Sequence, residues 1–181
     1  DRWGVNGSID LQTTTDGDAT IVNKTGIDFA SSNVGGNLSA MATTGSITDS
    51  GTVSVAKTAR FETQAADETV GLDQLDVTGS VALFTQGGAG NASIVNTTHV
   101  GPVERRVGGN SRFRSTRDRV TETGLTPVGG NATFTTLQVG QSFDLDPLGV
   151  NGSIALQTAT DPDATLLTQT AIDFPSTHVR V

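Results

Sequence analysis

The chain has 181 residues and a formal net charge of −8, an acidic balance that argues against general binding to nucleic acid or to anionic membranes. It contains no Cys, which excludes a disulfide framework, a thiolate metal site and a thiol nucleophile. Only 34% of the residues are hydrophobic and 4% are aromatic, and no apolar run approaches the roughly 20 residues of a membrane-spanning helix. Because Val, Ile and Thr are frequent while Pro is scarce, the composition favours a narrow core of small and β-branched side chains over a disordered chain.

One short motif, called here the opening motif, recurs along the whole chain. It begins with Val, has Gly as its third residue in most copies, and leads into a segment in which apolar and polar residues alternate. The copies begin, in chain order, at Val5, Val34, Val55, Val77, Val107, Val128, Val150 and Val179. The differences between successive starting positions are therefore 29, 21, 22, 30, 21, 22 and 29.

A longer repeat contains these short ones. Residues 4–12 nearly match residues 76–84 and 149–157, so the successive offsets are 72 and 73. Residues 16–22, which follow the first copy, recur in similar form as residues 161–167. The sequence therefore predicts a super-repeat with a period of 72–73, whose copies lie at about 5–76 and 77–149, with a partial copy at 150–181.

The alternation within each opening motif is typical of a β-strand. Ile9 and Leu11 fall on one side of such a strand and Ser8 and Asp10 on the other. A unit as short as the smaller intervals cannot bury its own apolar side, so it must stack on its neighbours. We therefore expect an all-β fold: one parallel β-helix (β-solenoid) segment over residues 1–181, cut from a larger chain, with about seven coils of two lengths, 21–22 and 29–30. Tandem β-sandwich modules, one for each super-repeat, are the alternative, but they would not require the shorter recurrence.

Several positions are expected to have fixed roles in such coils. The longer coils should carry extra loops around residues 16–18, 87–91 and 161–163. The third-position Gly should form a tight or crowded corner, and the Asn that follows it in some copies should form a hydrogen-bonded ladder along the axis. The expected inward column consists of Leu11, Leu83 and Leu156, with Phe61, Phe113 and Phe134 in other coils.

Two acidic loops form a candidate metal site. Asp16 and Asp18 recur as Asp161 and Asp163, and their oxygens could bind Ca²⁺. The alternative is simple turn chemistry, in which Asp and Gly close a loop. No other cofactor is expected.

The strongest local anomaly is a cluster of six of the eleven Lys and Arg residues. The guanidinium group of Arg binds sulfate, phosphate and carboxylate groups, so the cluster suggests contact with sulfated or other acidic glycans or with an acidic surface partner. The alternative is a solvated charged face that neighbouring acids partly neutralise. A nucleic-acid site is not expected, because aromatic side chains hardly intersperse the cluster. Its members are Arg105 and Arg106, expected at a corner, Arg112 and Arg114, expected to project outward on either side of inward-facing Phe113, and Arg117 and Arg119.

The repeats resemble those of filamentous-haemagglutinin-like exoproteins and related giant bacterial surface proteins. The stretches that carry the resemblance are residues 35–51 and 128–136, and the likeness extends over almost the whole chain apart from the charged residues 104–119. The resemblance implies a right-handed parallel β-helix, export across the outer membrane to an extracellular or cell-surface location, and a scaffold or adhesive role. It supplies no catalytic residues.

Three function classes remain open at this point. A structural or adhesive rod is preferred. A polysaccharide lyase or glycosidase would need clustered carboxylates, and Arg117, Asp118 and Arg119 are the only candidates. Ice binding would need a regular Thr column, which the spacing of Thr13, Thr15 and their later counterparts interrupts. Because both ends of the segment interrupt the pattern, we also expect end-to-end self-association of the isolated segment.

Overall fold

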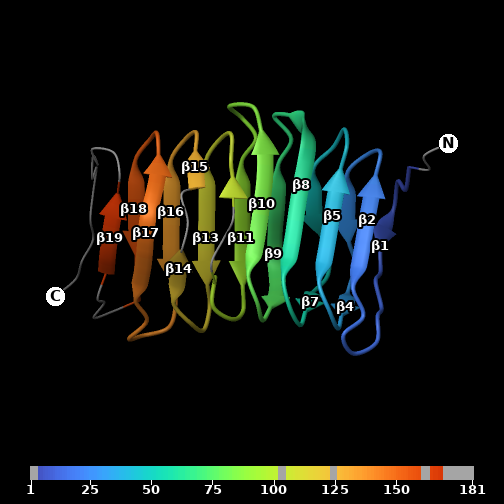
Figure 1. Cartoon of the computed structure of the whole chain (residues 1–181), viewed down its shortest axis with the longest axis horizontal. Helices are drawn as coiled ribbons and strands as arrows, with labels where there is room; N and C mark the ends of the chain where they lie inside the picture. Colours follow the sequence, from blue (N-terminus) through green and yellow to red (C-terminus); the bar gives the residue numbers. More distant parts are fainter. Residues whose placement is uncertain (1–3, 102–104, 123–125, 160–163, 169–181) are drawn as a thin grey trace.

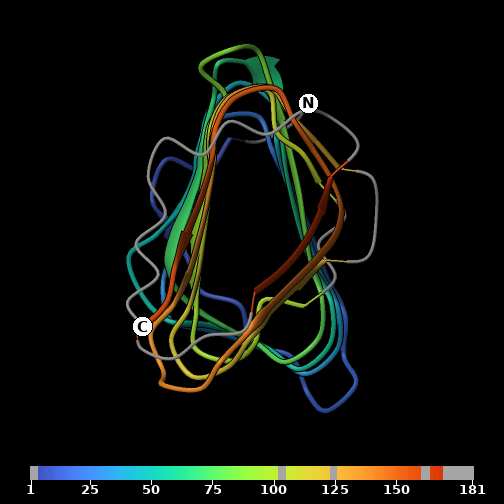
Figure 2. The same cartoon turned by 90° about the vertical axis from the view of Figure 1, so that its left-hand side faces the viewer.

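A computed structural model of the protein describes residues 4–101, 105–122, 126–159 and 164–168. These residues form nineteen β-strands and no helix, and therefore no helix that could cross a membrane. Every strand pairing among them is parallel. The strands lie side by side along the long axis of the molecule, from β1 at one end to β19 at the other (Figure 1). Seen along that axis, they outline a three-sided coil (Figure 2). The predicted parallel β-solenoid is confirmed.

The first sheet runs the length of the molecule and contains ten strands. Two of them, β4 (Ser32–Val34) and β7 (Val53–Val55), pair with each other, and β7 also pairs with the second half of β9. The main path contains, in order, β1 (Ser8–Ile9), β3 (Ile27–Phe29), β6 (Ile47–Asp49), β9 (Val70–Val77), β11 (Ala92–Asn96), β13 (Ser111–Ser115), β16 (Ala132–Thr136) and β18 (Ile154–Gln157).

Two further sheets complete the sides of the coil. The second sheet has five strands: β2 (Ala19–Asn23), β5 (Leu38–Ala42), β8 (Ala59–Ala66), β10 (Val81–Gln86) and β12 (Arg105–Arg106). The third sheet has four: β14 (Val120–Glu122), β15 (Thr126–Val128), β17 (Phe143–Val150) and β19 (Ala164–Thr168).

Strand register gives the length of each coil directly. On the first sheet, Ile27 pairs with Ile47, Ile47 with Val70, and Val70 with Ala92. Across all three sheets, the sequence numbers of paired residues differ by 19 to 23. The prediction of a separate class of longer coils is therefore wrong for the described part of the chain.

The long intervals between successive opening motifs instead mark places where the motif moves from one side of the coil to another. The motifs beginning at Val34, Val55 and Val77 precede strands of the second sheet, namely β5, β8 and β10. Those beginning at Val107, Val128 and Val150 precede strands of the first sheet, namely β13, β16 and β18. The segment from Val77 to Val107 hence makes more than one turn, and the super-repeat is not a whole number of turns.

The core is narrow, as the composition predicts. Phe61 pairs with Leu83 on the second sheet, whereas Phe113 and Phe134 are neighbours on the first sheet with ring centroids 5.6 Å apart. The side chains expected in one inward column therefore form two stacks, one on the second sheet and one on the first. Leu11 is only partly buried. Each fully buried large side chain contributes about 1.5–3 kcal/mol to stability, and small residues such as Ala40 fill the remaining space.

A bulge interrupts the first sheet within β9. Ile94 pairs with Leu72 and Asn96 with Leu75, so β9 holds one more residue than β11 between these pairs. The carboxylate of Asp49, one coil earlier, accepts hydrogen bonds from the two backbone N–H groups of the bulge, those of residues 73 and 74, at 3.1 and 2.9 Å. Burial raises the pKa of Asp49, and these two hydrogen bonds only partly oppose the shift.

Candidate functional site

The six clustered arginines lie in different surroundings. Arg105 is inside the coil, Arg106 is on the outer side of the second sheet, and Arg112 and Arg114 are on β13 of the first sheet. Arg117 and Arg119 are exposed in the turn that follows β13. The sequence cluster is therefore not one continuous surface patch.

Arg105 occupies a core position. It pairs with Leu83 in a row that also contains Phe61, and its residue is only 3% exposed. Its guanidinium carbon lies 4.7 Å from the ring centroid of Phe113 and 5.3 Å from that of Phe134, which is the geometry of a cation–π contact. The expectation that Arg105 belongs to an exposed anion site is wrong, because strand alternation turns it inward and Arg106 outward.

Arg112 and Arg114 lie on β13 on either side of buried Phe113, as predicted. Arg112 is exposed between Ser93 and Thr133, its partners in the two adjacent coils. Arg114 is half-buried on the same strand. Neither guanidinium lies within ion-pair distance of a carboxylate of the described residues. Arg112 is thus open to solvent, whereas Nε of Arg114 is buried without a hydrogen-bond partner.

The turn after β13 contains the three residues considered above for polysaccharide chemistry. Arg117 and Arg119 are exposed, and the carboxylate of Asp118 accepts a hydrogen bond of 2.7 Å from the backbone N–H of Arg119. The side-chain oxygen of Ser115 accepts the backbone N–H of Asp118. These contacts stabilise the turn.

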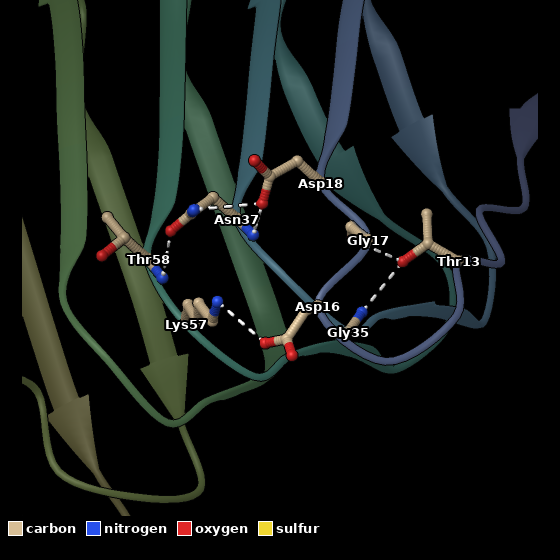
Figure 3. A network of polar contacts seen from close by, with 8 residues as sticks. All are labelled: Thr13, Asp16, Gly17, Asp18, Gly35, Asn37, Lys57 and Thr58. Carbon is tan, nitrogen blue, oxygen red and sulfur yellow. Dashed lines mark hydrogen bonds and ion pairs between the residues drawn. The ribbon is translucent and has the colours of Figure 1, made fainter.

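The first acidic loop uses its carboxylates within the protein. Asp16 forms an ion pair of 2.9 Å with Lys57, two coils away (Figure 3). Oδ1 of Asp18 accepts both the backbone N–H and the side-chain amide of Asn37, at 2.6 and 3.0 Å. The backbone hydrogen bond from Asn37 is the main reason why the pKa of Asp18 is lowered.

The same loop is closed by a hydroxyl group. Thr13 donates to the carbonyl of Gly17 at 2.7 Å and accepts the N–H of Gly35 at 2.9 Å (Figure 3). This geometry supports the turn-chemistry interpretation of residues 16–18. Within the described part of the chain, no group of three or more His, Asp or Glu side chains could hold a metal ion. Asp161 and Asp163 lie outside the described residues.

Sequence reasoning missed a small hollow on the outer side of the second sheet. It has a volume of about 350 Å³. Glu62, Phe84 and Arg106 line it from successive coils, since Glu62 pairs with Phe84 and Phe84 with Arg106. Arg60 forms an ion pair with Glu62 and places its guanidinium carbon 3.9 Å from the Phe84 ring centroid. The available signal was the alternation that places Arg60 and Glu62 outward on either side of buried Phe61.

Comparison with known proteins gives a coarse assignment. The model of a family described as repeats of unknown function (DUF5649) matches residues 16–84, so this part of the chain is similar to that family. No curated protein and no solved structure matches the chain. The repeats and the parallel stacking of the coils together make this chain a repeat-containing β-solenoid.

Proposed function

We propose that this chain is a structural segment of a larger bacterial protein that is exported to the cell surface or secreted, and that it has no enzymatic activity of its own. The observation that carries the proposal is the uninterrupted parallel ladder from β1 to β18 on one sheet. With a spacing of about 4.8 Å, seven coils make a rod of about 35 Å. Such a rod holds attached parts of a protein at a fixed distance and presents long faces to partners. The export route rests on the resemblance of the repeats to filamentous-haemagglutinin-like exoproteins.

The adhesive part of this proposal concerns the outer side of β13. Arg112 and Arg114 project from one strand and have no carboxylate partner among the described residues. Arginine binds sulfate and carboxylate groups with two parallel hydrogen bonds. We therefore assign sulfated glycans or other acidic surface molecules as the partners of this strand, with no cofactor involved.

Binding to immobilised heparin, compared with its desulfated form, tests the adhesive role. The double variant R112S/R114S should bind at least tenfold more weakly, because it removes both cations from the strand. The matched control K24S/K57S removes two cations elsewhere and should stay within twofold of the unmodified protein. If R112S/R114S bound heparin as tightly as the unmodified protein, the proposed role of β13 in glycan binding would be refuted.

The structural role has its own test. Incubation of the protein with pectin, alginate and chondroitin sulfate should leave the chain length of each polymer unchanged by size-exclusion chromatography. Depolymerisation of any of them would overturn the non-enzymatic proposal in favour of a lyase or glycosidase. End-to-end association of the isolated segment stays a prediction, and a strictly monomeric state at high concentration in sedimentation experiments would contradict it.

A further inference from the structure

We infer that the hollow between Glu62, Phe84 and Arg106 is a binding site for a hexuronate unit of a polysaccharide. The site lies on the second sheet, whereas the proposed glycan contact of Arg112 and Arg114 lies on the first sheet. The two sites can therefore be tested, and can fail, separately.

The hollow lies where two protruding turns are followed by a tighter corner in the next coil. The turns after β8 and β10 extend beyond those of the neighbouring coils (Figure 1). They adopt left-handed backbone conformations at Asp67 (φ 67°) and Gly87 (φ 79°), and Asp67 ties the two turns together by accepting the N–H of Ala89 at 2.9 Å. The next coil has a tight corner at Gly108, where a Cβ would lie 2.2 Å from the carbonyl oxygen of Gly87. Gly108 therefore packs directly against the backbone of Gln86 and Gly87, and all three residues line the hollow.

The framework of the site is held in place by packing. Arg60 stacks on Phe84 and pairs with Glu62, whose side chain is only 18% exposed. The hydroxyl group of Thr85 accepts the N–H of Gly108 at 3.2 Å. Because these contacts hold the side chains of Glu62 and Phe84 in place, the entropy cost of ordering them on binding is small.

The charges of the site select the ligand class. Arg60 and Glu62 neutralise each other, while Arg106 is exposed and has no ion pair with a carboxylate of the described residues. A single carboxylate of the ligand can bind the Arg106 fork through two parallel hydrogen bonds. Glu62 and Gln86 can accept hydrogen bonds from sugar hydroxyl groups, and Phe84 supplies apolar surface for ring C–H groups.

Competing anions fit less well. A phosphomonoester dianion or a densely sulfated sugar would bring additional negative charge close to the carboxylate of Glu62, which is unfavourable. The volume of about 350 Å³ lies at the lower end of the range of about 300–1,000 Å³ for small-molecule sites. One or two sugar units with one carboxylate each meet both conditions.

Titration calorimetry with galacturonate and glucuronate tetramers tests this site on the whole chain. We expect at least one tetramer to bind, R106Q to weaken that binding at least tenfold, and the methyl ester of the same tetramer to bind at least tenfold more weakly. K24Q removes an exposed cation that belongs to neither proposed site and should stay within twofold.

Three results would overturn the inference: binding of neither tetramer, unchanged binding by R106Q, or equal binding of the methyl ester. A second variant, G108A, addresses the shape of the site, because the added methyl group would press on the wall at Gly87 and should weaken tetramer binding. Far-UV circular dichroism confirms the fold of each variant before titration. Loss of heparin binding by R112S/R114S with intact tetramer binding would separate the two sites.

Discussion

The side-chain oxygen of Asn110 accepts a hydrogen bond of 2.8 Å from the backbone N–H of Asn131, the residue that occupies the same corner one coil later. The same bond joins Asn91 to the N–H of Asn110 and Asn131 to the N–H of Ser153. At another corner, Asn37 accepts the N–H of Thr58. The predicted Asn ladder therefore exists, but each step joins a side chain to the next backbone. It satisfies a corner N–H that no strand ladder pairs, and it fixes the axial register of the coils.

Removing one step of this ladder should destabilise the fold modestly. We expect N110A to lower the free energy of unfolding by about 1 kcal/mol, the net value of one hydrogen bond. N110D keeps the acceptor, as Asp18 does naturally toward Asn37, and should lose less. Urea unfolding followed by circular dichroism measures both variants. Equal losses for N110A and N110D would show that the acceptor is not what matters at this corner.

Asn96 should be far more sensitive than the corner residues. Its side chain is buried and bonds both the N–H and the carbonyl of Val77, at 2.9 and 3.0 Å, as well as the carbonyl of His99. Removing it leaves buried backbone groups unpaired, so N96A should cost about 3 kcal/mol in urea unfolding. N33A, on an exposed position of β4, should change stability by less than about 0.5 kcal/mol. A loss below about 1 kcal/mol for N96A would indicate that water replaces its bonds.

Arg105 should behave as a core residue despite its charge. R105A removes a guanidinium that contacts the rings of Phe113 and Phe134, and we expect it to lower the free energy of unfolding by about 3 kcal/mol. R105K keeps the charge but loses the planar stacking, so it should remain clearly destabilised. The matched surface variant R112A should lie within about 0.5 kcal/mol of the unmodified protein in the same urea experiment. If R105A had the same free energy of unfolding as the unmodified protein, Arg105 would not be packed as the structure shows.

Asp49 should make stability depend on pH in the acid range. Its pKa is raised in the folded state, mainly because it is partly buried, so between its usual 3.8 and the raised value the folded protein binds more protons than the unfolded chain. The contribution of Asp49 is therefore fully present below the usual pKa and is lost as the pH rises through the folded pKa. D49N should remove this part of the pH dependence of the free energy of unfolding.

Urea unfolding at a series of pH values tests the assignment. The curves of D49N and of the unmodified protein should differ in slope within that window and run parallel above it. Parallel curves throughout would contradict the role of Asp49. D73N is a useful companion, because the carboxylate of Asp73 adds to the shift of the Asp49 pKa, and the variant should reduce the slope without abolishing it.

The sequence alone determined the class of fold and the roles of several residue types. Alternation over a few residues makes strands, and the short recurrence of the opening motif requires those strands to stack, because no single unit can bury its own apolar side. The crowded Gly of the corners followed from the same pattern: a Cβ at Gly130 would lie 2.4 Å from Oδ1 of Asn110. These properties depend on neighbours in the chain and on the same position one coil away, so a repeat displays them directly.

Only the tertiary structure decided on which side of the coil each copy of the motif lies. Strands of all three sides have the same alternation, and a corner Gly or Asn finds an equivalent partner in whichever coil precedes it. The longer interval between Val77 and Val107 therefore does not by itself show that the motif moves from the second sheet to the first. For the same reason, the adjacent arginines 105 and 106 look alike in the sequence, yet one packs on Phe113 and the other lines the hollow beside Phe84. The hollow itself arises from the difference between two stacked corners, and register across coils decides which corners meet.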